Sequence, residues 1–171
     1  MPRNVEIKAK IDSVDAMLSL AAKLADAGPT ELLQDDTFFP CPNGRLKLRA
    51  FPDGTGELIF YQRPDSQGPK TSEYTISPTH APDTLRQTLT AAYGQAGRVR
   101  KKRTLFLIGR TRLHLDAVEG LGDFLELEVV LEPTESATAG EATAKALLVQ
   151  LGISQEQLVA KAYVDLLAGG G

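Results

Sequence analysis

Apolar and polar residues alternate one by one along most of this chain, which is the pattern of strands with one buried and one polar face. In residues 4–11, for example, Val5, Ile7 and Ala9 alternate with polar or charged neighbours. Turn sequences rich in glycine, proline and asparagine separate such stretches. The pattern predicts eight strands, over residues 4–11, 32–39, 45–51, 57–63, 72–77, 99–108, 111–118 and 123–130.

Apolar residues spaced three or four apart, which is typical of helices, occur in four other stretches. Either Ser13 or Asp12 could cap the first of these stretches, and Ser154 has the capping-box spacing at the last. Gly94 and Gly152 follow the ends of the two stretches between them. The predicted helices cover 13–24, 82–93, 138–151 and a stretch from 154 to the glycines at 169–171. No repeat or long linker divides the chain, so we expect a single α+β domain over residues 1–171.

The charged residues are grouped by sign. The chain contains 19 Lys and Arg residues against 22 Asp and Glu residues, a formal net charge of −3. Every formal charge between residues 98 and 115 is basic, and every one between 116 and 135 is acidic. Like charges such as Lys47 and Arg49 also stand two residues apart, about 6–7 Å from each other on one face of a strand, where they repel.

A closed antiparallel β-barrel explains this grouping, with the charged face inward and the helices packed on the apolar outer face. Arginines and lysines in the lumen would bind a chain of phosphates through charge-assisted hydrogen bonds. Carboxylates in the same lumen would bind a hard cation such as Mg²⁺, which prefers oxygen ligands. The pattern therefore predicts binding of a nucleotide or polyphosphate together with a divalent metal.

Composition argues against several other classes of protein. Cys41 is the single cysteine, so neither an internal disulfide nor a multi-cysteine zinc site is expected. No apolar run reaches the roughly 20 residues of a membrane helix, and the first residues lack the apolar core of a signal peptide. We therefore expect a cytoplasmic protein without a membrane partner. Nucleic-acid binding through residues 98–112 is disfavoured, because the net charge is negative and aromatic residues are sparse.

Several short motifs, in chain order, resemble those of the CYTH superfamily, also called triphosphate tunnel metalloenzymes. The first, Glu6-Ile7-Lys8-Ala9-Lys10, is similar to the ExExK signature, with Lys8 at its second acidic position. The others are Arg45-Leu46-Lys47-Leu48-Arg49, Arg63-Pro64-Asp65, Arg112-Leu113-His114-Leu115-Asp116, and residues 118–122, 124–128 and 163–167. The sequence looks most similar to the class IV adenylyl cyclase branch, whose relatives include thiamine and inorganic triphosphatases.

The resemblance implies an eight-stranded tunnel that binds a triphosphate and Mg²⁺ or Mn²⁺. The carboxylates expected to hold the metal are Glu6, Asp116, Glu126 and Glu128. The residues expected to bind phosphates are Lys8, Lys10, Arg45, Lys47, Arg49, Arg63, Lys101, Arg103, Arg112 and Lys161. Those expected to take part in catalysis are Glu6, Lys10, Arg112 and His114.

The same resemblance implies an adenylyl cyclase reaction, in which the 3′-hydroxyl of ATP attacks the α-phosphorus and 3′,5′-cyclic AMP and pyrophosphate form. Two alternative functions would use the same tunnel. In one, water attacks the terminal phosphorus of inorganic, thiamine or nucleoside triphosphate. In the other, suggested by Lys8, the protein binds a triphosphate or polyphosphate without turnover. The expected partner is thus a triphosphate-bearing small molecule, such as ATP or inorganic triphosphate, and the sequence leaves a homodimer open.

Overall fold

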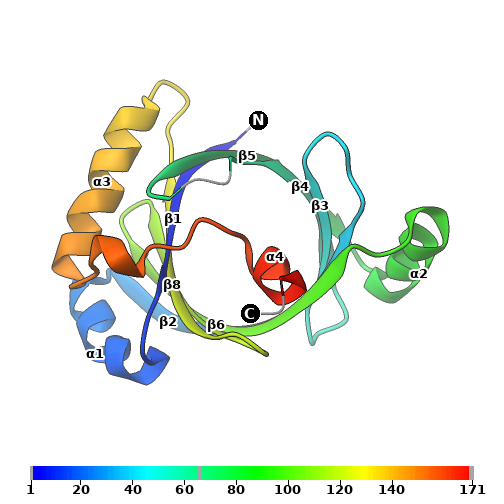
Figure 1. Ribbon diagram of the computed structural model, residues 1–171, viewed down its shortest axis with the longest axis horizontal. Coiled ribbons are helices and arrows are strands. Elements are labelled where there is room, and N and C mark those ends of the chain that lie inside the picture. The colour runs from blue at the N-terminus through cyan, green and yellow to red at the C-terminus, as the bar shows by residue number, and fades with distance from the viewer. Residues whose placement is uncertain (1, 65–66, 170–171) are drawn as a thin grey trace.

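The computed structural model describes residues 2–64 and 67–169. In this part of the chain, eight antiparallel strands form a ring in the order β1-β5-β4-β3-β2-β6-β7-β8, and β8 pairs with β1 (Figure 1). The strands are β1 (Arg3–Lys10), β2 (Ala27–Phe39), β3 (Arg45–Ala50), β4 (Gly56–Gln62), β5 (Lys70–Thr79), β6 (Gly97–Ile108), β7 (Thr111–Val118) and β8 (Gly122–Val130). The predicted α+β class and its eight antiparallel strands are confirmed.

Helices α1 (Val14–Leu24) and α3 (Ala137–Gln150) cover the outer face of the ring at β1, β7 and β8 (Figure 1). The apolar positions of these three strands point outward into one buried cluster, which includes Ile7, Leu113 and Leu127. Helix α3 contributes Leu147 and Leu148 to the same cluster. Because the apolar side chains of these strands face outward, the polar residues that alternate with them point into the ring.

Helix α2 (Pro82–Tyr93) lies at the opposite side of the ring, near β2 and β3 (Figure 1). The strand predicted at 32–39 is longer than expected and begins at Ala27. Ala27 pairs with Leu107 near the end of β6, and the register between the two strands shifts between Ala27 and Thr30. Gly28 and Pro29, read from the sequence only as a helix stop, therefore belong to this strand.

The fourth predicted helix, from residue 154 to the glycines at 169–171, was wrong as a continuous element. The structure has a short 3₁₀ helix, η1 (Gln155–Gln157), then an extended stretch, and then α4 (Tyr163–Ala168). Leu158 forms a β-bridge with Ala9, and the Val159 N–H donates to the Lys8 carbonyl. Pairing with the end of β1 thus replaces the helical hydrogen bonds that the local sequence favours.

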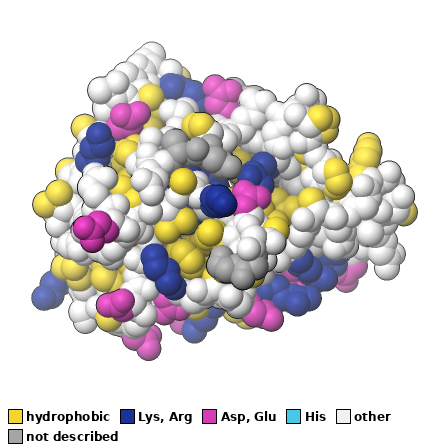
Figure 2. All heavy atoms as spheres, in the orientation of Figure 1, with side chains coloured by type: hydrophobic (Ala, Val, Ile, Leu, Met, Phe, Trp, Pro, Cys, Tyr) yellow, Lys and Arg dark blue, Asp and Glu magenta, His cyan; other side chains and the backbone are white. Residues whose placement is uncertain are grey.

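The extended stretch, residues 158–162, crosses one end of the ring, and α4 lies at that end (Figure 1). Lys8 and Lys70 hold the stretch by donating from Nζ to the carbonyls of Lys161 (3.3 Å) and Ala160 (2.5 Å). The space-filling view of this end shows hydrophobic, basic and acidic side chains together (Figure 2).

Asp65 of the third motif, Ser66 of the predicted turn and the final residues 170–171 lie outside the described residues. Within the described residues, no helix is both long and apolar enough to cross a membrane.

Candidate functional site

A chamber of about 370 Å³ lies inside the ring, lined by the inward-facing side chains of its strands. Lys101 and Lys102 illustrate the alternation, since Lys101 is buried in the chamber wall and Lys102 is exposed on the outside. Most of the residues predicted for the site line this chamber, namely Glu6, Lys8, Lys47, Arg49, Arg63, Lys101, Arg103, Arg112, His114, Glu126 and Glu128.

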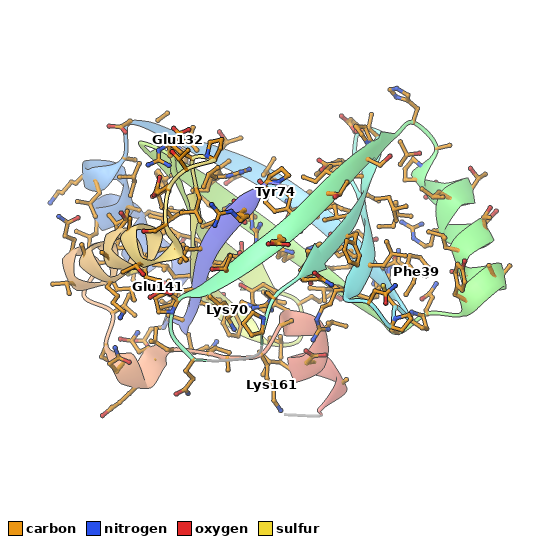
Figure 3. All side chains as sticks on the ribbon, turned by 90° about the horizontal axis from the view of Figure 1, so that it is seen from above. Phe39, Lys70, Tyr74, Glu132, Glu141 and Lys161 are labelled. Carbon is orange, nitrogen blue, oxygen red and sulfur yellow. The ribbon has the colours of Figure 1, made fainter. Side chains whose placement is uncertain are left out.

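Three predicted phosphate ligands do not line the chamber. Lys10 is exposed as the last residue of β1, and its Nζ donates to the carbonyls of Leu121 (3.3 Å) and Asp123 (3.2 Å). Arg45 forms an ion pair with Asp165 on α4. Lys161 is exposed at the end of the barrel, and Figure 3 shows its side chain pointing away from the ring. Alternation places a side chain on a face of the sheet, but it does not say where along the barrel the chamber ends.

The residues of β1 that line the chamber are Asn4, Glu6 and Lys8. Residues at i, i+2 and i+4 share one face of a strand, and Lys10 falls outside the chamber. An alternative alignment of the signature, with Asn4 at the first acidic position, Glu6 at the second and Lys8 as its lysine, would place all three positions in the chamber. In that alignment the departure from the signature would be Asn4.

One wall of the chamber carries three carboxylates, those of Glu6, Glu126 and Glu128. One oxygen from each lies within 4.8 Å of the others. Glu6 faces Glu128 across the β1–β8 ladder. Burial and the neighbouring charges of Glu126 and Glu128 raise the pKa of Glu6 to about 8. Three converging carboxylate oxygens form the kind of donor set that a hard divalent cation takes, so this group could hold such a metal ion.

Basic side chains surround Glu126 and Glu128. Glu126 lies 3.4 Å from His114 Nδ1, 3.6 Å from Arg103 Nη2 and 3.9 Å from Lys8 Nζ. Burial alone would raise the pKa of Glu126, but the His114 hydrogen bond and the charges of Arg103 and Lys8 hold that pKa well below its usual range. Glu128 lies 3.1 Å from Arg112 Nε. Near neutral pH, this wall therefore combines an ionised Glu126 with a mostly protonated Glu6.

A second wall gathers cations around Asp36, whose side chain is 1% exposed. Arg49 donates to both Asp36 oxygens at 2.8 Å, and Nζ of Lys47 and of Lys101 each lie 3.3 Å from Oδ2. Burial, opposed by the charge of Asp36 and reinforced by that of Arg49, lowers the pKa of Lys101 to about 7. One carboxylate thus organises three basic groups, and the excess of positive charge suits an anionic ligand. We name these four residues the Asp36 cluster.

Asp36 was not predicted from the sequence as a site residue. It lies within the predicted strand 32–39, at the same alternation as Gln34 and Phe38, which also line the chamber. This alternation indicates that Asp36 faces inward. It does not reveal that Asp36 stands opposite Arg49 in the β2–β3 ladder.

Asp116 occupies a different place from the one expected for a metal ligand. It is fully buried beside Arg103, which donates to its two oxygens at 2.8 Å each. The hydroxyl of Tyr163, from α4, donates to the same carboxylate at 2.8 Å. Asp116 is not part of the Glu6–Glu126–Glu128 group and does not line the chamber. Its contacts orient Arg103 and connect the C-terminal helix to the chamber wall.

Together, the closed ring of strands and the two charged walls define a barrel protein with a polar internal chamber. The sequence pattern of the CYTH domain matches residues 2–163. The chain belongs to the CYTH domain family, which confirms the resemblance drawn from its motifs.

Known proteins similar to this chain cover almost its whole length. It is 25% identical over 173 residues to adenylate cyclase CyaB of Aeromonas hydrophila, with 95% of this chain and 87% of that protein aligned. The fold is similar to that of PH1012 from Pyrococcus horikoshii OT3, with a TM-score of 0.84 at 20% identity, covering 95% and 98% of the two chains. It is also similar to HpAC1 from Hippeastrum, a protein with a dominant triphosphatase activity, with a TM-score of 0.69 at 17% identity and coverage of 99% and 96%.

Proposed function

We propose that this protein is a metal-dependent enzyme that acts on a triphosphate inside the chamber, with a class IV adenylyl cyclase-like reaction as the first candidate. The observation that supports it is the pairing of a carboxylate wall, Glu6, Glu126 and Glu128, with the Asp36 cluster in one chamber. The relationship to CyaB favours ATP as the substrate and 3′,5′-cyclic AMP as the product. The whole chain, residues 1–171, would act as one CYTH-like domain.

In this proposal, Glu6, Glu126 and Glu128 hold Mg²⁺ or Mn²⁺. When bound, such a cation supplies Lewis-acid chemistry by withdrawing charge from phosphate oxygens. Asp116 is removed from the predicted set of metal ligands, because its oxygens are taken by Arg103 and Tyr163.

The basic residues of the chamber bind and orient the phosphate chain. Lys47, Arg49 and Lys101 are already held in place by Asp36, so binding costs little further ordering of these side chains. Arg103, oriented by Asp116, and Arg112 donate to oxygens on which negative charge grows as the bond to the leaving group breaks. His114, in contact with Glu126, keeps that carboxylate ionised and in position. Lys10, which lies outside the chamber, takes no part.

Triphosphate hydrolysis is the second candidate, and the similarity to HpAC1 favours it. The phosphate-binding residues would be the same, and water would replace the ribose hydroxyl as the nucleophile. The third candidate, binding without turnover, was suggested by Lys8 at an acidic position. If the signature is aligned so that all three of its positions line the chamber, Lys8 is the signature lysine. The argument for binding without turnover then rests on Asn4 instead. The cytoplasmic location, the lack of a nucleic-acid partner and a homodimer stay predictions.

Incubation of the full chain with ATP, inorganic triphosphate and thiamine triphosphate, each with Mg²⁺ or Mn²⁺, tests the proposal. Chromatography then separates cyclic AMP, pyrophosphate and orthophosphate. Cyclic AMP with pyrophosphate is the expected result, and orthophosphate without cyclic AMP would support hydrolysis. If no product forms from any triphosphate, the protein is not an enzyme of this type.

Metal binding is expected to strengthen with pH between about 6 and 8. Because the pKa of Glu6 is raised to about 8, the cation must displace its proton at lower pH. The affinity for Mn²⁺ should therefore rise by up to about tenfold per pH unit below that pKa and level off above it. Calorimetry in two buffers of different ionisation enthalpy should also detect release of about one proton at pH 7.

The Glu6→Gln variant provides the control for this pH dependence, because it cannot release a proton at that position. Its affinity for Mn²⁺ should be weaker than that of the wild type and much less dependent on pH. An affinity of the wild-type protein that does not change between pH 6 and 8 would contradict the assignment of Glu6 to the metal.

A further inference from the structure

Helix α4 brings one aromatic residue of the C-terminal segment, Tyr163, into the wall of the chamber. Tyr163 is 6% exposed, and its ring lies 5.0 Å from the ring of Phe124, measured between centroids, at an interplanar angle of 60°. On the same helix, both oxygens of Asp165 accept hydrogen bonds from the guanidinium of Arg45 on β3. These contacts fix the position of Tyr163 without the help of a ligand.

The hydroxyl of Tyr163 completes the hydrogen bonding of Asp116. Oδ2 of Asp116 accepts from this hydroxyl and from Arg103 Nη2, and Oδ1 accepts from Arg103 Nε, each at 2.8 Å. Because Asp116 is 0% exposed, the loss of one donor would leave a buried anion less well compensated. Arg103 would then have to move toward the unpaired oxygen, so the hydroxyl helps to set the orientation of this guanidinium.

The ring of Tyr163 contacts basic groups that belong to both walls of the chamber. Nζ of Lys8, on β1, lies 3.9 Å from the ring centroid, and Nζ of Lys101, in the Asp36 cluster, lies 5.7 Å from it. An ammonium group within about 6 Å of an aromatic face is attracted by the ring electrons, more strongly where water is excluded. Both lysines are buried, so the ring supports the Lys8 ammonium directly and the Lys101 ammonium more weakly.

Packing alone does not account for these contacts of Tyr163. A phenylalanine would fill nearly the same space against Phe124 but would give no hydrogen bond to Asp116. An aliphatic residue would fill part of that space and would offer no aromatic face to Lys8. Both the hydroxyl and the ring are thus used, and each meets a group that leads to a basic side chain of the chamber.

We propose that Tyr163 is a positioning residue for the reaction in the chamber: its hydroxyl orients Arg103 through Asp116, and its ring holds the Lys8 ammonium in place. This inference rests on the proposed function, because Arg103 and Lys8 must act on the phosphate chain. Tyr163 acts through these neighbours and exchanges no proton. Since Arg103 donates to oxygens that gain charge in the transition state, its orientation should affect kcat more than KM.

Tyr163→Phe removes the hydroxyl alone and tests the first part of the inference. With Mn²⁺ and ATP, or inorganic triphosphate if that is the compound turned over, kcat should fall about tenfold and KM should stay within about twofold. In an Arg103→Lys background the same substitution should lower kcat by less than about twofold, because the group through which the hydroxyl acts is already changed. Tyr93→Phe is the matched control, since Tyr93 on α2 is 62% exposed, and it should change neither constant.

Tyr163→Met removes the ring as well and should also raise KM by about fivefold, because Lys8 loses its aromatic contact. An unchanged KM would overturn the part assigned to the ring. Wild-type kcat in Tyr163→Phe, or losses that multiply in the double variant as they would if Tyr163 only stabilised the fold, would overturn the part assigned to the hydroxyl. If Tyr163→Met does not fold, the cycle of Tyr163→Phe with Arg103→Lys decides. An inactive wild-type protein would contradict the proposed function itself, so the two kinds of failure are distinguished.

Discussion

The Glu126→Gln variant is expected to lose metal-dependent turnover by about a hundredfold or more while retaining its fold. Glutamine preserves the size of the side chain but removes the charge that faces His114, Arg103 and Lys8. The variant therefore loses one carboxylate of the metal group and leaves three basic neighbours without their common partner. Steady-state rates with ATP and Mn²⁺, together with the Kd for Mn²⁺, measure the effect.

Glu132→Gln is a suitable control for this variant. Glu132 lies just beyond β8, its side chain is exposed, and its contact is with Arg110 on the surface. We expect unchanged turnover in the control and an unchanged thermal unfolding midpoint in both variants to within a few degrees. Wild-type activity of Glu126→Gln would show that this carboxylate does not serve the reaction.

The Arg49→Ala variant is expected to bind the triphosphate chain about a hundredfold more weakly and orthophosphate about tenfold or less more weakly. Arg49 is the bidentate member of the Asp36 cluster, so its loss removes donors and leaves Asp36 to pair with Lys47 and Lys101 alone. A long anion that spans several basic groups should suffer more from this change than a small one. Competition binding with orthophosphate, pyrophosphate and triphosphate measures the difference.

Arg100→Ala is the matched control for Arg49→Ala, because Arg100 lies on the outer face of β6 and pairs with Asp35 at 3.5 Å. Arg49→Lys retains a positive charge without the bidentate contact and should show an intermediate loss. Equal weakening for orthophosphate and triphosphate in Arg49→Ala would argue against a role along the phosphate chain.

Alternation along the sequence predicted which side of each strand faces the chamber, because that depends only on neighbouring residues in the chain. Lys47 and Arg49 face inward around the buried Leu48 as expected. Alternation could not show which acidic group meets which basic group. Asp36 opposite Arg49, and Asp116 opposite Arg103, follow from the registers of β2–β3 and β6–β7, which are set by the closure of the whole ring.

The C-terminal region shows where local sequence preference was overridden. The stretch after Ser154 has a helix-starting pattern, but Leu158 pairs with Ala9 and the chain continues in an extended form. This change brings Tyr163 to the chamber wall, where its hydroxyl meets Asp116. Helix propensity depends on the residues of the segment itself and does not include contacts with residues distant in the sequence.

The crossing stretch 158–162 is fastened mainly through its backbone. Lys8 and Lys70 donate to the carbonyls of Lys161 and Ala160, so these hydrogen bonds do not depend on which side chains occupy positions 160 and 161. Substitutions at positions 160 and 161 should therefore leave these hydrogen bonds intact. Replacement of Lys8 or Lys70 removes the side-chain donor, and the hydrogen bond is lost. We therefore expect positions 160 and 161 to tolerate substitution much better than Lys8 and Lys70 do.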